Sequence, residues 1–189
     1  MDLNKLRDES FEIAKAHGWH DEELPDETYL MLIITEIAEA VQADRKDKHA
    51  DVAKFKEYQT YYGTFLPSEE IRTIRFREDF EAYIKNSVED ELSDVVIRCL
   101  DLAALRGVSL DGVTDETQHF HVRDYSLDVL CYALCCRVTA ITPLRSKIAG
   151  VIAYTLAWCS YNGIDIEFFI EQKMKYNRLR EYKHGNKKY

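Results

Sequence analysis

The sequence predicts an all-α fold, a helical bundle, and three observations support this prediction. Glycine and proline are scarce, at 7 and 3 of 189 residues, so few positions interrupt a helix. Apolar residues recur at helical spacing along most of the chain. No segment alternates apolar and polar residues over the length of a strand. The length suits one domain with its own core, so we expect residues 1–189 to form a single domain.

Six amphipathic segments are predicted as helices. Asp26 is expected to cap the second helix, and Ser87, followed three residues later by Asp90, to cap the third. Glycines that favour helix termination follow three of the six: Gly18, Gly107 and Gly163. The expected helices span residues 3–17, 28–46, 88–106, 125–139, 146–161 and 166–180.

The segment from about residue 47 to residue 86 interrupts this pattern. It is rich in aromatic residues, and it contains Gly63 and Pro67, which together disfavour one continuous helix. We therefore predict an inserted helical excursion that turns near Pro67.

One internal similarity is present. Residues 95–110 align without gaps on residues 151–166, and both copies read as an apolar helix, a glycine, an aliphatic residue and a new N-cap, Ser109 or Asp165. The alignment extended backwards places Lys147 opposite Glu91 and Gly150 opposite Asp94. This pattern indicates either a duplication whose second copy lost its carboxylates or the common sequence of helix ends.

The charge is distributed unevenly. The net formal charge is −9, but residues 173–189 contain seven basic residues and one acid, which leaves 18 basic and 33 acidic residues, a charge of −15, on the preceding 172. An acidic body is a poor platform for duplex nucleic acid, which requires a basic face. The chain has no run of about 18 apolar residues and no apolar leader after Met1. We therefore expect no membrane partner and a cytoplasmic location.

The five cysteines do not suggest a zinc site. They lie within apolar helical sequence, they form no CxxC pair, and no histidine lies near them in the sequence. We predict that they are reduced core residues. They are Cys99, Cys131, Cys135, Cys136 and Cys159.

Two pairs of carboxylates are the strongest functional signal. Glu36 with Glu39, and Glu91 with Asp94, are each spaced i, i+3, so each pair occupies one helical face. If the two helices pack side by side, four carboxylates meet, and their repulsion calls for a cation. Oxygen ligands select Mg²⁺, or alternatively Mn²⁺, over zinc. The alternative is that the acids belong to solvated helix surfaces.

The basic C-terminal segment is the second signal. Lys173, Asn177 and Arg180 are spaced i, i+4, i+7 on one helical face, and the residues that follow include Lys183 and His184. Cations and an amide at this spacing suit a polyphosphate. A solvated basic tail that complements the helix C-terminus is the alternative.

At these residues the sequence resembles the all-α nucleoside triphosphate pyrophosphohydrolases, the superfamily of MazG proteins, dimeric dUTPases and dCTP pyrophosphatases. Their signature is an ExxE helix followed by an ExxD helix, which here reads Glu36 to Glu39 and Glu91 to Asp94. Residues 31–45, 91–111 and 173–185 resemble the MazG-like branch. Two features depart from the family: Thr35 stands where a further Glu is frequent, and the gap at about 47–86 is unusually long.

The resemblance implies hydrolysis of a nucleoside or deoxynucleoside triphosphate between the α and β phosphates, as in sanitation of nucleotide pools. It implies Mg²⁺ held by Glu36, Glu39, Glu91 and Asp94. Glu36 or Glu39 would be the catalytic proton acceptor, and Trp19 would stack on the base unless it merely packs. The phosphate-binding residues would be Lys173, Asn177, Arg180, Lys183 and His184. The resemblance also implies a partner half, from a pseudo-dimeric monomer or a homodimer.

Two other functional classes are possible. Helical bundles with carboxylate pairs also hold di-iron centres, but those need a histidine at i+3 from a ligand acid, and none stands at i+3 from Glu36, Glu39, Glu91 or Asp94. A non-enzymatic helical interaction protein, with surface acids and an insertion that binds a partner, is the main alternative. The base and sugar preference depends on pocket shape and is not readable from the sequence.

Overall fold

The computed structural model describes residues 1–65, 68–117 and 121–183, and over these residues the chain forms helices and no strand. This confirms the all-α bundle. Each predicted helix boundary lies within two residues of the observed one. The helices are α1 (Leu3–Ala16), α2 (Asp26–Asp44), α3 (Val52–Phe65), α4 (Glu69–Tyr83), α5 (Val88–Leu105), α6 (Val113–Glu116), α7 (Leu127–Thr139), α8 (Leu144–Tyr161) and α9 (Ile166–Arg178).

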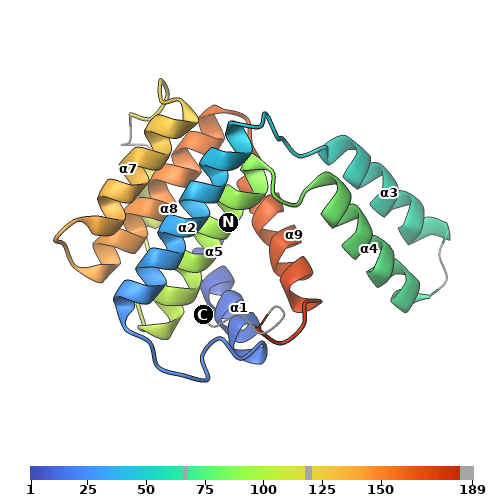
Figure 1. Ribbon diagram of the computed structural model, residues 1–189, viewed down its shortest axis with the longest axis horizontal. Helices are drawn as coiled ribbons and strands as arrows, with labels where there is room; N and C mark the ends of the chain where they lie inside the picture. The colour runs from blue at the N-terminus through green and yellow to red at the C-terminus, as the bar shows by residue number, and fades with distance from the viewer. Residues whose placement is uncertain (66–67, 118–120, 184–189) are drawn as a thin grey trace.

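Four helices lie side by side and form the body of the molecule (Figure 1). α2 packs against α5 and α7, and α8 packs against the same two helices, so the four close into a bundle. α1 and α9 cover the remaining side of α5. α5 is therefore the central helix, which explains why most of its side chains are buried.

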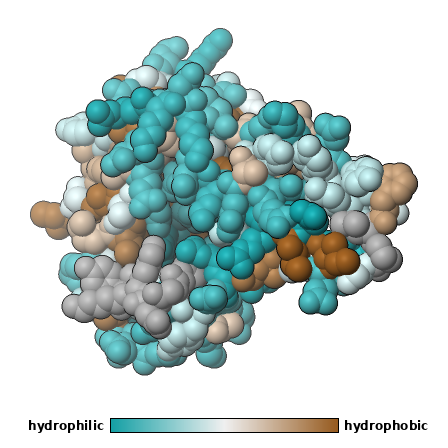
Figure 2. Space-filling view, turned by 45° about the vertical axis from the view of Figure 1, so that its right-hand side comes forward, coloured by the Kyte–Doolittle hydropathy of each residue, from teal (hydrophilic) through white to brown (hydrophobic). Residues whose placement is uncertain are grey.

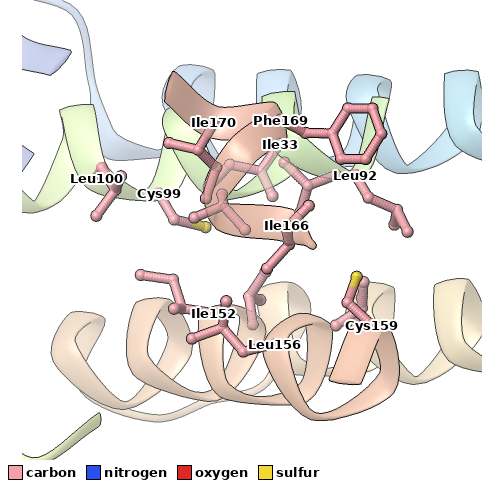
Figure 3. Close-up of a cluster of buried hydrophobic side chains, with 14 of the residues drawn as sticks. Ile33, Leu92, Cys99, Leu100, Ile152, Leu156, Cys159, Ile166, Phe169 and Ile170 are labelled. Carbon is pink, nitrogen blue, oxygen red and sulfur yellow. The ribbon is translucent and has the colours of Figure 1, made fainter. Parts of the chain in front are cut away.

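The core lies where α5, α8 and α9 meet (Figure 3). Cys99 of α5, Ile152 of α8 and Ile170 of α9 point toward one another, and none of the three is measurably exposed. Each fully buried aliphatic side chain contributes about 1.5–3 kcal/mol through the hydrophobic effect. Packing across the three helices therefore fixes α5, the helix that bears the ExxD pair, in the bundle.

The helix caps agree with the predictions in part. Ser87 Oγ accepts a hydrogen bond from Asp90 N (3.2 Å), and Asp165 caps α9, as predicted. Asp26 is not the N-cap of α2, because Pro25 takes that position and the Asp26 carboxylate accepts a 2.6 Å hydrogen bond from Arg106 Nε. Ser109 begins no helix, since α6 follows the left-handed Gly112 instead.

The inserted segment forms an arm. α3 and α4 pack against each other and project away from the bundle (Figure 1). Near its base the arm buries Phe55, Phe76 and Phe80, and the Phe80 ring stacks on Tyr176 of α9 at 4.4 Å. The segment forms two helices rather than one continuous helix, as predicted. Gly63 itself lies inside α3, at an exposed position where it costs only about 1 kcal/mol. The predicted turn at Pro67 falls outside the described residues.

Hydrophobic side chains gather on the surface of this arm (Figure 2). They are Tyr58, Tyr61, Phe65, Ile71 and Ile74. The arm therefore differs from the bundle, where residues of these types are mostly buried.

Two expectations from composition can be compared with the structure. All five cysteines are free, and Cys99, Cys131 and Cys159 are buried as predicted. Cys135 is half-buried and Cys136 is exposed, because both lie off the face by which α7 packs on the bundle. No helix within the described residues is both long enough and apolar enough to cross a membrane.

Candidate functional site: a carboxylate pocket

A cavity of about 380 Å³ lies among α1, α2, α5 and α9. Its volume falls in the range of small-molecule sites. Acidic side chains come from α2 and α5, and basic side chains come from α5, α9 and the residues after α9. The polar and charged residues that line it are Ser10, His17, Trp19, Thr35, Glu36, Glu39, Lys85, Asn86, Glu91, Asp94, Arg98, Asp101, Lys173, Tyr176, Asn177 and Arg180.

Three of the four predicted metal ligands converge in this cavity. One carboxylate oxygen each from Glu36, Glu91 and Asp94 lies within 4.8 Å of the other two. The i, i+3 spacing on α5 and the packing of α2 against α5 bring them together. Glu39 is not part of this cluster; it is exposed and lines the cavity wall one helical turn beyond Glu36.

Burial and mutual repulsion disfavour the ionised form of the carboxylates in this cluster. Burial, followed by the charge of Asp94, raises the pKa of Glu36 from 4.5 to about 7. Burial, Asp94 and Asp90 raise the pKa of Glu91 from 4.5 to about 8. A divalent cation would restore the ionised form of both, and an all-oxygen donor set suits Mg²⁺ or Mn²⁺. The residues therefore fit a magnesium site.

A buried lysine lies beside the cluster. The ammonium of Lys173 is 2.7 Å from Asp94 Oδ2 and donates 2.9 Å hydrogen bonds to both carboxylate oxygens of Asp90. Burial alone lowers the pKa of Lys173, but the two carboxylates together raise it well above its usual range. Lys173 is thus fixed among carboxylates, where the sequence suggested a contact with phosphate. Asp90 was not predicted as a site residue.

Arg98 is a second unpredicted member of the site. Its Nε donates a 2.9 Å hydrogen bond to Glu36 Oε1, and its side chain is half-buried. Burial lowers the pKa of Arg98, while Glu36 and Asp94 raise it by more. Arg98 follows Asp94 by four residues on α5, so helical periodicity extended beyond the ExxD motif could have identified it.

The residues predicted from the C-terminal segment lie in several places. Asn177 and Arg180 line the cavity, and Asn177 Oδ1 is buried without a hydrogen-bond donor among the described residues. The Arg180 guanidinium lies 5.9 Å from the Tyr176 ring centre, and burial lowers the pKa of Arg180. Lys183 lines a smaller adjoining cavity. His184 falls outside the described residues.

Trp19 lies at the junction of the two cavities and lines both. Near it, His20 Nε2 lies 2.8 Å from Asp101 Oδ1, and the His20 ring stacks on Phe11 at 4.8 Å. Sequence reasoning missed this histidine–aspartate pair, whose members are 81 positions apart. The position of Trp19 is compatible with stacking on a base, and that role stays a prediction.

Comparisons with known proteins add no relative, since no family model, curated protein or solved structure matches this chain.

Proposed function

We propose that this protein catalyses Mg²⁺-dependent hydrolysis of a nucleoside or deoxynucleoside triphosphate between the α and β phosphates, releasing a monophosphate and pyrophosphate. One observation carries the proposal: three largely buried carboxylates from two helices converge in a cavity that Asn177 and Arg180 also line. Excess buried negative charge attracts a divalent cation, and the cation with the basic wall matches a polyphosphate. The resemblance to the all-α pyrophosphohydrolases, and a role in nucleotide-pool sanitation, belong to this proposal.

Each residue has a distinct role in it. Glu36, Glu91 and Asp94, whose carboxylate oxygens converge, would hold the cation. Arg180 binds and orients phosphate oxygens, and the Asn177 amide donates a further hydrogen bond to them. Glu39, which is exposed and outside the cluster, accepts the proton of the attacking water. When bound, the cation supplies charge neutralisation and a water of lowered pKa.

The bundle supports a pseudo-dimeric monomer as the form that carries the site. The pair α2–α5 bears the carboxylates, and the pair α7–α8 packs on it. In the proposed pseudo-dimeric monomer, α7–α8 would take the place of a second subunit. A homodimer of this already paired chain is the other arrangement that the proposal admits.

The test is an assay of a panel of canonical and modified deoxynucleoside triphosphates with Mg²⁺, in which pyrophosphate and orthophosphate are measured separately. We expect pyrophosphate as the first product. Asp94→Asn should abolish its release while the helical circular dichroism stays unchanged, because the amide removes a charged metal ligand. Orthophosphate as the first product would contradict cleavage at the α–β bond, and full activity of Asp94→Asn would contradict the metal site.

A further inference from the structure

Asp90 is the most deeply buried carboxylate at the edge of the site, yet it is not one of the converging oxygens. Its exposed fraction is 0%, and both of its carboxylate oxygens accept hydrogen bonds from Lys173 Nζ at 2.9 Å. Oδ2 also accepts a 2.8 Å hydrogen bond from Asn86 N. All of these contacts are with other parts of the protein, and Asp90 is not among the described residues whose oxygens converge on a possible metal-ion position.

Lys173 connects Asp90 to the metal-binding cluster. Lys173 is only 5% exposed. Its ammonium lies 2.7 Å from Asp94 Oδ2, so three carboxylate oxygens surround it. Moving the ammonium toward a bound phosphate would leave two buried carboxylates without their cation. Breaking a buried ion pair in this way is strongly unfavourable, because it leaves an uncompensated buried charge, and this keeps Lys173 in place.

The backbone around Asp90 is held equally firmly. Asp90 N donates to Ser87 Oγ (3.2 Å) at the helix cap, and Ser93 Oγ donates to Asp90 O (2.7 Å). Asp90 is therefore held in a fixed position in the first turn of α5, and Lys173 reaches it from α9. Through Lys173, Asp90 is linked to Oδ2 of Asp94, and the second oxygen of Asp94, Oδ1, is not part of this link.

We propose that Asp90 is a positioning residue: through Lys173 it fixes the orientation of Asp94, and thereby sets the affinity of the carboxylate cluster for a divalent cation. This inference rests on the proposed metal site. Groups that orient metal ligands without touching the metal commonly change affinity about 10- to 100-fold when they are altered. The role is distinct from a phosphate contact, because it acts on the cation before any nucleotide binds.

Two variants separate positioning from simple charge. The double variant Asp90→Asn with Lys173→Met removes one negative and one positive charge, so the net charge near the cluster is unchanged, and buried ion pairs often tolerate such replacement. Asp90→Glu keeps both charges and shifts the carboxylate by one methylene. Asp79→Asn is the matched control, since Asp79 is also a buried aspartate but accepts its hydrogen bond from Gln59 Nε2 in the arm.

The experiment measures Mn²⁺ binding to each full-length protein without nucleotide, by electron paramagnetic resonance or calorimetry, beside its circular dichroism and melting temperature. We expect the double variant and Asp90→Glu to bind Mn²⁺ about 10- to 100-fold more weakly than wild type, and Asp79→Asn to bind within twofold of it. In steady-state assays at saturating Mg²⁺, KM for the nucleotide should stay within twofold, because no phosphate contact is lost.

The outcomes are distinguishable. A wild-type protein that binds no Mn²⁺ overturns the proposed function itself. Wild-type binding that is unchanged in the double variant contradicts only the positioning role of Asp90. If the double variant does not fold, Asp90→Glu decides the matter, since unchanged Mn²⁺ affinity in that folded variant contradicts the proposal equally.

Discussion

In the two helix pairs of the bundle, α2–α5 and α7–α8, the second helix ends in the same way. α5 is followed by Gly107 and α8 by Gly163, and both glycines have positive φ, 63° and 70°. After each glycine the chain turns back in the same way: Val108 N donates to Ala103 O at 2.8 Å, and Ile164 N donates to Cys159 O at 2.9 Å. The internal similarity seen in the sequence therefore corresponds to the same local structure at both helix ends.

The two pairs differ in what lies between their helices. Lys147 and Gly150 stand opposite Glu91 and Asp94 in the alignment, and the Lys147 ammonium donates to Val138 O at 2.8 Å. The Arg137 guanidinium lies 3.9 Å from the Tyr154 ring centre, and a Cβ added to Gly150 would lie 3.1 Å from Arg137 Nη1. Cationic side chains thus pack into one pair, whereas the carboxylates of the other line an open cavity. Repelling carboxylates therefore leave a cavity in one pair, whereas the cations of the other pair find partners and fill the corresponding space.

Glu91 on α5 and Lys147 on α8 stand at aligned positions, and their replacement by glutamine should have very different effects. Glu91→Gln should lower Mg²⁺-dependent pyrophosphate release more than about 100-fold, because loss of a metal ligand exceeds the effect of loss of an outer group. Lys147→Gln, at the aligned position of α8, should leave the rate within twofold. The measurement is the initial rate of pyrophosphate release at saturating Mg²⁺. Equal losses in both variants would show that the two helix pairs do not differ in function.

The sequence predicts the acidic half of the site better than the basic half. Glu36, Glu91 and Asp94 could be placed together because helical spacing and amphipathicity orient each helix toward its neighbour. The pairing of Lys173 with Asp90 joins residues 83 positions apart, and it depends on how α9 crosses α5, which no local pattern encodes. Glu39 was predicted from the same motif as Glu36, but one helical turn is enough to carry it from the cluster to the exposed wall.

The arm and the caps show the same limit. A helical insertion could be predicted from its composition, but its projection from the bundle could not, because exposure depends on tertiary packing. Asp26 has the residue type of an N-cap, and it forms an ion pair with Arg106, 80 positions away, instead. Local propensity therefore predicts elements well, while long-range charge pairing decides which polar groups each element leaves available.

The carboxylates of the α2–α5 pair should also make the stability of the protein depend on pH. Glu36 and Glu91 have pKa values of about 7 and 8 in the folded protein, above the ordinary value of 4.5. The metal-free folded state therefore holds more protons than the unfolded state between these values, so its stability should fall as pH rises from about 4.5 to 8. Each unit of pKa shift corresponds to about 1.4 kcal/mol, so the two carboxylates together should lower the free energy of unfolding by several kcal/mol between pH 4.5 and pH 8.

If the proposed metal site is correct, Mg²⁺ should reverse this loss, because it would bind the ionised carboxylates and so stabilise the folded state more at pH 8 than at pH 5.5. Thermal melts at both values, with and without Mg²⁺, test the expectation. Glu91→Gln should flatten the pH dependence and reduce the Mg²⁺ effect, while Lys147→Gln should change neither. An Mg²⁺-induced shift that is the same at both pH values would contradict coupling between metal binding and these two carboxylates.

The ends of α5 and α8 have the same local geometry, and we expect them to be equivalent in energy as well. A Cβ added at Gly107 or Gly163 meets no atom within 4 Å, so alanine at either position introduces only the strain of the left-handed conformation. That strain costs about 1–2 kcal/mol, and Gly107→Ala and Gly163→Ala should therefore destabilise the protein by the same amount in urea unfolding. A much larger loss of stability for Gly107→Ala alone would show that the end of α5 is constrained more tightly than the end of α8. The two helix pairs would then differ in their backbone as well as in their side chains.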